Sequence, residues 1–130
     1  DKKGLIDPNP VATYARLAPD THTPVVTAGR VFGVWNGLHC LDERTLSPIW
    51  VSRETAFSRY VTLVASDTRV LAITLTGELI HFDPRSQTFQ SLDRIKVLPD
   101  EAGLHSHPAF VGTRMYVRGD GELVCIDLKE

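Results

Sequence analysis

The sequence repeats itself about every forty residues. Each of three units contains an apolar run, a short turn, a second run rich in β-branched or aromatic residues, a tight turn and a third run that closes on an aspartate. Arginines recur at intervals of 39 and 45 residues, and the closing aspartates recur at intervals of 41 and 44. These anchors are Arg30, Arg69 and Arg114, and Asp42, Asp83 and Asp127. Any fold for this chain must therefore use one small structural unit several times.

Every unit has the signature of antiparallel strands joined by hairpins. The tight turns contain Asn36-Gly37, Thr76-Gly77 and Gly119-Asp120-Gly121, and these residue types tolerate the positive φ of a two-residue hairpin. Apolar residues do not recur at helical spacing over any long segment, so we expect almost no helix. Four short strands with their turns need about 40 to 50 residues, which is the length of one β-propeller blade. The predicted fold is all-β, with about three four-stranded antiparallel propeller blades that form part of a ring.

The blade boundaries follow from the same pattern. We expect blades at residues 23–53, 61–92 and 107–130, the last of them incomplete because it lacks an outer strand. The outer strands of the first two blades are expected at about residues 47–53 and 87–92, and the connections between blades at 54–60 and 99–107. Residues 1–22 contain three prolines and are interpreted as an irregular lead-in or as the end of a preceding blade.

Composition argues against two classes of partner. Fourteen Lys and Arg oppose sixteen Asp and Glu, giving a formal net charge of -2, and the basic residues are scattered along the chain. Nucleic acid is therefore not an expected partner. No apolar stretch approaches the roughly 18 to 20 residues that cross a bilayer, so we expect no direct membrane insertion. The only methionine is Met115, from which we expect a processed product or a segment excised from a longer chain.

The first unit ends on a recognisable motif. Asp42 is followed by Thr45 and Trp50. This spacing resembles the Asp-x-x-Thr-Gly-x-x-x-Trp ending of the blades in PQQ-dependent dehydrogenases and in the propeller lipoprotein of the outer-membrane β-barrel assembly machinery. Leu46 stands where that ending usually has glycine, and the second unit has Ser91 where a tryptophan would be. The resemblance implies a quinoprotein-like propeller in which Trp50 docks against the neighbouring blade.

The resemblance, which covers about residues 23–127, leaves two functional hypotheses. The same blade serves non-catalytic assembly factors and PQQ-dependent oxidoreductases. A PQQ enzyme similar to this family carries a ring of two adjacent cysteines and calcium-binding acids, and neither is visible here. We expect no cofactor in this segment, and PQQ is possible only in a full-length parent. We favour a non-catalytic scaffold that binds a protein or another ligand. The alternative is a portion of a quinoprotein oxidoreductase whose cofactor site lies outside this segment. The resemblance also implies a periplasmic or otherwise extracytoplasmic location.

Few residues qualify as a chemical site, and no catalytic residue is predicted. His105 and His107 lie on one face of an extended segment and are weak candidates for a metal site, although no third ligand is near them in sequence. Cys40 and Cys125 occupy equivalent places two blades apart, which exceeds the roughly 7 Å Cα separation that a disulfide tolerates. Both are therefore predicted to be free, buried thiols.

The recurrent residues are expected to have structural tasks. Each closing aspartate is positioned to accept hydrogen bonds from backbone amides of the next turn. His39 and His81 fall close to the same place in successive units, which indicates packing. Because closed propellers use four to eight blades, three blades leave two sheet faces without a neighbour. We expect these faces to be covered by the remaining blades of a longer parent chain, by a protein partner, or by a second copy in a homodimer that completes a six-bladed ring.

Overall fold

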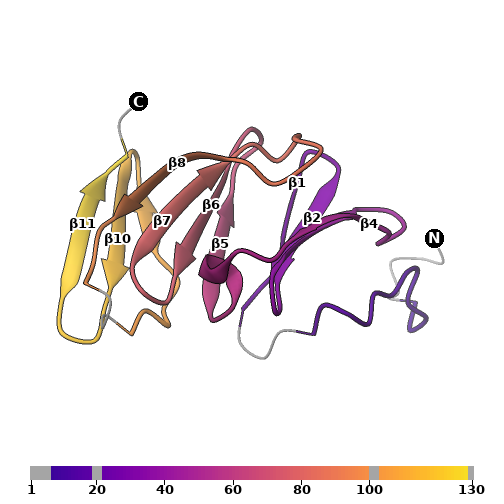
Figure 1. The fold of residues 1–130 in the computed structure, drawn as a ribbon, viewed down its shortest axis with the longest axis horizontal. Coiled ribbons are helices and arrows are strands. Elements are labelled where there is room, and N and C mark those ends of the chain that lie inside the picture. Colours follow the sequence, from indigo (N-terminus) through magenta and orange to yellow (C-terminus); the bar gives the residue numbers. More distant parts are fainter. Residues whose placement is uncertain (1–6, 19–21, 100–102, 129–130) are drawn as a thin grey trace.

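The computed structural model describes residues 7–18, 22–99 and 103–128, and these form three antiparallel sheets that lie side by side (Figure 1). The first sheet contains β1 (Val25–Thr27), β2 (Arg30–Val34), β3 (Leu38–Asp42) and β4 (Pro48–Ser52) in sequence order. The second contains β5 (Val61–Ala65), β6 (Val70–Thr74), β7 (Glu78–Phe82) and β8 (Ser91–Lys96). The third contains β9 (Ala109–Val111), β10 (Arg114–Arg118) and β11 (Leu123–Asp127).

The predicted all-β fold is confirmed. A single 3₁₀ turn, η1 (Thr55–Phe57), is the one helical element among the described residues. Within that part of the chain nothing helical is both long and apolar enough to span a bilayer. The predicted outer strand at 47–53 is confirmed as β4 to within one residue at each end. The third sheet has three strands among the described residues, as expected for the last unit.

The repeated anchors occupy one equivalent position in the three sheets. Arg30 lies directly opposite Asp42 across β2 and β3, and Arg114 lies directly opposite Asp127 across β10 and β11. In the second sheet the Val70↔Phe82 pair is the last of the β6–β7 ladder, and Arg69 and Asp83 are the next residues outward on each strand. The sequence period therefore corresponds to the structural period.

Each pair of consecutive sheets shares its own apolar core. The first core lies between the first two sheets and contains Phe32, Val34, Leu38, Cys40, Phe57, Val61, Leu63, Val70, Ala72, Ile80 and Phe82. The second lies between the second and third sheets and contains Ile73, Leu79, Leu98, Leu104, Met115 and Val117. Alternate residues of a strand point to opposite faces of the sheet. Both faces of β6 are buried, and its sequence is therefore a continuous apolar run.

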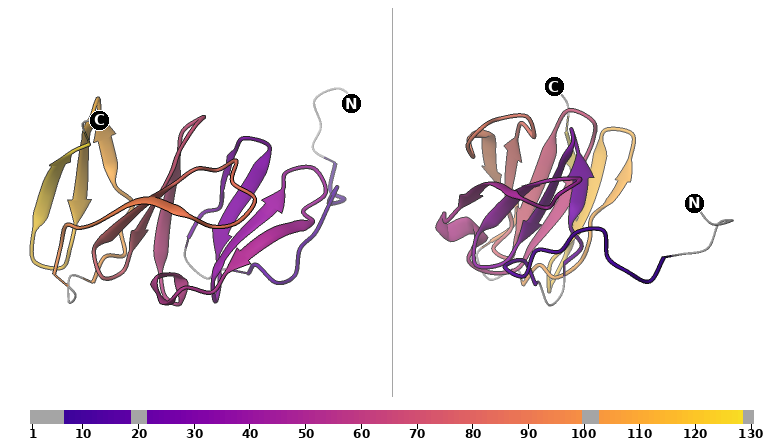
Figure 2. Two further views of the ribbon diagram at one scale, coloured as in Figure 1. Left: turned by 45° about the horizontal axis from the view of Figure 1, so that its top comes forward. Right: turned by 90° about the vertical axis from the view of Figure 1, so that its right-hand side faces the viewer.

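The two outer faces of the stack differ in their cover. We call the side of each sheet that is turned toward the following sheet its forward face. In the first sheet the opposite face is partly covered by the later part of the segment before β1, and Figure 2 shows this segment beside the sheet. The position of a Gly33 Cβ would lie 2.6 Å from the Leu17 side chain, and Leu41 is 1% exposed. The forward face of the third sheet carries Val111 and Leu123, which are 68% and 69% exposed. This face presents its apolar side chains to solvent.

The predicted position of the outer strand in the second sheet, about 87–92, is wrong by about four residues, since β8 spans Ser91–Lys96. The preceding loop is held by contacts between sheets. Phe89 lies edge-on to Phe57 and Phe82, with ring centroids 5.1 and 5.5 Å apart. Because this ring is drawn into the first core, pairing with β7 begins only afterward, with a register shift between His81 and Phe82.

Candidate functional site

Trp50 on β4 connects the first two sheets. Its indole Nε1 donates a hydrogen bond to the backbone carbonyl of Ser86, in the β7–β8 loop, at 3.1 Å. The Arg30 guanidinium donates to the same carbonyl. The indole ring lies 5.9 Å from the Phe32 ring and 6.1 Å from the Phe89 ring, measured between centroids. Trp50 thus contacts the neighbouring blade, as the resemblance implies, and its polar atom is satisfied by protein.

The turn after β3 depends on Asp42. One carboxylate oxygen of Asp42 accepts hydrogen bonds from the Arg44 amide at 3.0 Å, the Thr45 amide at 2.8 Å and the Thr45 hydroxyl at 2.9 Å. These hydrogen bonds hold the pKa of Asp42 below its usual range. The Thr45 amide has the largest effect, followed by the Thr45 hydroxyl and the Arg44 amide. Leu46 has a φ of +56°, the left-handed conformation that glycine adopts without a steric penalty. This explains why the related motif has glycine at that position.

The other two closing aspartates also accept hydrogen bonds. Asp83 accepts a hydrogen bond from the Arg85 amide at 2.8 Å. Asp127 accepts one from the Thr113 hydroxyl, across the β10–β11 pair, at 2.8 Å. The hydrogen bond from the next turn, which the sequence predicts, is thus present at Asp42 and Asp83. At Asp127 the Thr113 hydroxyl, in the β9–β10 turn, is one donor.

The two thiols differ in exposure. Both cysteines are free, but only Cys40 is buried, and the prediction that Cys125 is buried is wrong. Register explains the difference: Cys40 lies opposite Phe32, and Cys125 opposite Tyr116, at equivalent places on the forward faces of their sheets. The second sheet covers Cys40, whereas the described residues provide no sheet beyond Cys125. Burial raises the pKa of the Cys40 thiol to about 11, against a smaller opposing effect of the Arg30 guanidinium.

We predict that the two thiols react at very different rates with an aromatic disulfide reagent. The Cys125 side chain is accessible, while Cys40 is fully buried and protonated at pH 8. One thiol per chain should react within minutes in native buffer, and the second only after denaturant is added. A Cys125→Ser variant should lose the fast phase alone. Two equally fast thiols would contradict the placement of Cys40 in the first core.

His39 and His81 fall one residue apart in the repeat and therefore lie on opposite faces of their sheets. His81 pairs with Leu71 and occupies the position equivalent to Cys40, whereas His39 precedes that position by one residue and faces the other way. The Nδ1 atom of His39 lies 3.3 Å from the Tyr14 hydroxyl, and its Nε2 lies 3.0 Å from the Trp35 carbonyl. His39 is 2% exposed and serves to pack the lead-in segment against the first sheet.

Stability should fall on acidification partly because of His39. Burial lowers the pKa of His39, with the Trp35 carbonyl opposing and Arg53 assisting, and burial likewise lowers the pKa of His81. Below about pH 6.5 the unfolded chain therefore binds more protons than the folded chain, and the free energy of unfolding decreases until the folded pKa is passed. Denaturant titrations at pH 8, 6 and 5 should show a smaller decrease in His39→Gln than in the parent sequence. An unchanged decrease would contradict this origin.

The two candidate metal ligands lie on the connection before β9, and both are exposed. The His105 ring lies 5.2 Å from the Tyr60 ring, and the His105 carbonyl accepts a hydrogen bond from the Tyr60 hydroxyl at 3.1 Å. The hydroxyl of Ser106, between the two histidines, donates to the Arg118 carbonyl at 3.2 Å. Over the described ranges no group of three His, Cys, Asp or Glu side chains is arranged to hold a metal ion. The structure places these histidines in a connection that ties the second and third sheets together.

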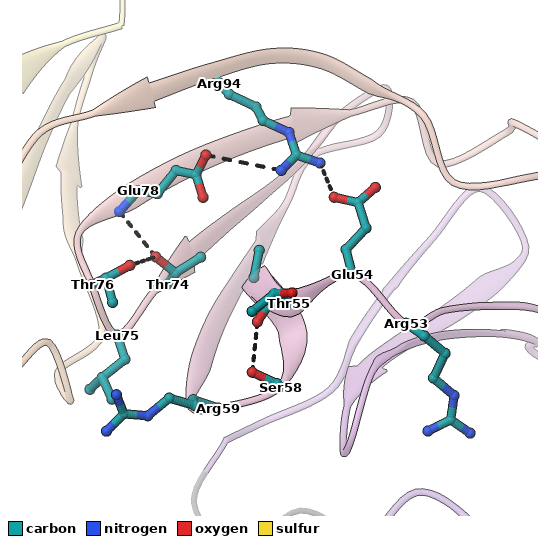
Figure 3. Close-up of a pocket in the computed structure, with 11 residues that line it drawn as sticks. Arg53, Glu54, Thr55, Ser58, Arg59, Thr74, Leu75, Thr76, Glu78 and Arg94 are labelled. Atoms are coloured by element: carbon teal, nitrogen blue, oxygen red, sulfur yellow. Dashed lines mark hydrogen bonds and ion pairs between the residues drawn. The ribbon is translucent and has the colours of Figure 1, made fainter. Parts of the chain in front are cut away.

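A groove of about 740 Å³ lies where the chain passes from the first sheet to the second (Figure 3). One wall is the connection after β4, which contributes Arg53, Glu54, Thr55, Ala56, Ser58 and Arg59. The other wall comes from the second sheet and contributes Thr74, Leu75, Thr76, Glu78 and Arg94. Turns and connections meet at this end of the sheets, as shown by the Gly37 amide bonding to the Phe57 carbonyl and the Leu104 amide bonding to the Leu75 carbonyl. We call this end the loop face.

The charges in the groove fall into two groups. Arg94 forms an ion pair with Glu54, lies 4.0 Å from Glu78 and also donates from Nε to Ser91 Oγ at 3.1 Å. Arg53 donates to the backbone carbonyl of Asn36. Figure 3 shows Arg94 between Glu78 and Glu54, while the Arg59 side chain extends toward Leu75 and the Arg53 side chain extends the opposite way. Sequence reasoning missed this groove, since Arg94 lies far along the chain from Arg53 and Arg59 and is brought to them only by stacking of the sheets.

Comparison with known proteins identifies the fold. No family model matches the chain, and no curated protein matches its sequence. The structure is similar to BamB from Moraxella catarrhalis, with a TM-score of 0.61 and 18% identity over 81% of this chain and 32% of that one. It is also similar to the quinohemoprotein alcohol dehydrogenase ADHIIG from Pseudomonas putida HK5, with a TM-score of 0.64 and 15% identity over 84% of this chain and 19% of that one.

A quinohemoprotein alcohol dehydrogenase from Comamonas testosteroni is a third similar structure, with a TM-score of 0.54 and 16% identity over 82% of this chain and 18% of that one. The chain therefore spans about a third of the length of BamB and about a fifth of the two dehydrogenases. At such identities the likeness concerns the fold. The three sheets are blades of a β-propeller fold, as in these similar structures.

The described residues do not fit a PQQ site of the kind the family implies. Cys40 is buried in the first sheet and Cys125 is exposed on the third, so the two thiols cannot form a ring of adjacent cysteines. The same residues contain no cluster of three acidic, cysteine or histidine side chains that could supply a calcium site. No chemical step through PQQ is therefore assigned to these blades.

Proposed function

We propose that the chain is part of a non-catalytic β-propeller that acts as a scaffold and presents its loop face to a protein or another ligand. One observation carries this proposal: the side chains most suited to chemistry are engaged in structural contacts. His39 bonds to Tyr14 and to a backbone carbonyl, Cys40 is buried in the first core, and Asp42 organises a turn. Their separate engagement supports a framework role rather than a shared reactive centre.

The competing candidate is a portion of a PQQ-dependent oxidoreductase, which the structural similarity to two quinohemoprotein alcohol dehydrogenases favours. Titration of the longest natural polypeptide that contains these blades with PQQ and Ca²⁺, followed by absorbance and calorimetry, separates the two. The scaffold proposal expects no saturable uptake. Stoichiometric binding of PQQ would overturn it in favour of the oxidoreductase.

We further propose that the remaining blades of a longer chain cover the forward face of the third sheet. Two observations support this: Val111 and Leu123 are largely exposed there, and the chain spans only part of the length of the similar structures. A homodimer that completes a six-bladed ring is the other arrangement. Sedimentation of the 130-residue chain should show self-association through this face, and a well-folded monomer with no tendency to associate would contradict both arrangements.

By resemblance, we propose a periplasmic or otherwise extracytoplasmic location for the parent protein. The test is a fusion of the first thirty or so residues of the parent polypeptide to an alkaline phosphatase that is active only after export. Enzyme activity in intact cells is expected. An inactive fusion, with normal activity from an exported control, would contradict the proposal.

A further inference from the structure

We propose that the groove on the loop face binds an acidic peptide segment of a protein partner, whose carboxylates are held by Arg59 and Arg53. This inference rests on the proposed scaffold function and specifies the chemistry of its partner. The groove volume of about 740 Å³ lies within the roughly 300 to 1,000 Å³ typical of ligand sites. It opens beside the connection between two blades, where a partner has access without disturbing either apolar core.

Arg59 is the arginine of the groove whose donors are all available to a ligand. It is exposed, it lines the groove, and no described residue forms an ion pair or hydrogen bond with its side chain. Arg53 has one backbone carbonyl as its partner, which leaves most of its donors available. A guanidinium presents its donors in a planar fork that matches a carboxylate. Figure 3 shows Arg59 reaching toward Leu75 and Arg53 reaching the opposite way, so each would bind a separate carboxylate of an extended ligand.

The opposite charges show which anion the groove selects. Glu54 and Glu78 also line it, and both are held by Arg94. These fixed carboxylates would repel a dense polyanion such as a nucleic acid, and the chain as a whole has a formal net charge of -2. An extended peptide with spaced acidic side chains places single carboxylates at Arg59 and Arg53 and keeps neutral backbone near the glutamates. Ala56 and Leu75 supply apolar contact along the same groove.

The test uses a fluorescein-labelled ten-residue peptide of alternating Glu and Ser, in which every second side chain lies on one side of an extended chain, about 7 Å apart. Fluorescence anisotropy with the 130-residue chain should show saturable binding that weakens as salt increases. Arg59→Gln should weaken it about fivefold, and the Arg53→Gln/Arg59→Gln double variant roughly twentyfold. A peptide with Gln in place of Glu should not bind.

Arg44→Gln is the matched control, because Arg44 is an exposed arginine in the β3–β4 turn at the other end of the first sheet. It should bind the acidic peptide like the parent sequence. Equal weakening by Arg44→Gln and Arg59→Gln would indicate general charge attraction and contradict the groove as the binding site. Tighter binding of a ten-nucleotide single-stranded DNA than of the peptide, with the same dependence on Arg59, would overturn the choice of ligand. Absence of any peptide binding would overturn the inference.

Failure of this inference is distinguishable from failure of the scaffold proposal. If the parent polypeptide takes up PQQ while the peptide still binds through Arg59, the scaffold proposal fails and the proposal of a peptide-binding groove is retained. If PQQ does not bind and the peptide does not bind either, the scaffold proposal stands and the groove is not its binding site. Thermal unfolding of each variant accompanies the titrations, and Arg59→Gln should unfold like the parent sequence because this exposed side chain forms no hydrogen bond or ion pair with a described residue.

Discussion

Replacing Phe32 with alanine should lower the free energy of unfolding by about 3 to 5 kcal/mol, a large part of the stability of a domain of this size. Phe32 is fully buried in the first core. Its ring centroid lies 5.6 Å from that of Phe82 in the second sheet and 5.9 Å from that of Trp50. Deleting the ring removes buried apolar area from two sheets at once and leaves a cavity that stiff β-strands cannot close. Urea denaturation followed by circular dichroism measures the effect.

Phe110→Ala provides the matched control. The same ring is removed, but Phe110 lies on β9 and is 40% exposed, so the expected loss is about 1 kcal/mol. Equal losses in the two variants would mean that the first core contributes no more than a surface contact. Such a result would contradict the packing of the first sheet on the second.

Gly77→Ala should destabilise the chain by about 2 to 4 kcal/mol for two separate reasons. Gly77 has a φ of +77°, where a residue with a Cβ is strained. Its Cβ would also lie 2.5 Å from the Leu98 Cβ and 3.0 Å from the Leu98 carbonyl oxygen. Leu98 is buried in the second core, and its amide bonds to the Gly77 carbonyl, so it cannot withdraw without losing both contacts. Thermal and urea unfolding of the variant measure the loss.

Gly112→Ala separates strain from collision. Gly112 has a φ of +59°, but a Cβ there would meet nothing within 4 Å. Only the backbone penalty of about 1 to 2 kcal/mol is expected. If the Gly77 and Gly112 variants lose equal stability, the close approach of Leu98 to the β6–β7 turn is not a constraint.

The architecture could be predicted from the sequence because two features repeat together: the interval between the anchor residues, and the turn-forming residues between the strands. Arg30 and Asp42 recur at one period, and the same residues are cross-strand partners in the structure. The position of β8 could not be predicted, since every residue of that strand is exposed and the strand carries no alternating pattern. Its start is set by Phe89, which is drawn into a core that another sheet completes.

The site was less predictable than the fold, because it depends on which sheet covers which face. Cys40 and Cys125 are equivalent in the repeat, but one is covered by the next sheet and the other is exposed. A periodic sequence pattern carries no information about where the stack of sheets is covered. Arg59 and Arg94 are distant in sequence and line one groove only because consecutive sheets stack at that point. Single residues recognised by motif, such as Trp50, were easier to interpret because their contacts are local to one junction.

The division of the interior into two cores, one for each junction, has a consequence for how the molecule opens. Each apolar cluster joins only consecutive sheets, so cooperativity passes along the stack from neighbour to neighbour. The smaller cluster, built around Leu104 and Met115, holds the terminal sheet. Amide protons of β10 should therefore exchange with solvent deuterium through partial opening, while those of β3 and β6 should exchange only through global unfolding. For the 130-residue chain by itself, we therefore expect opening to begin at the sheet formed by β9, β10 and β11.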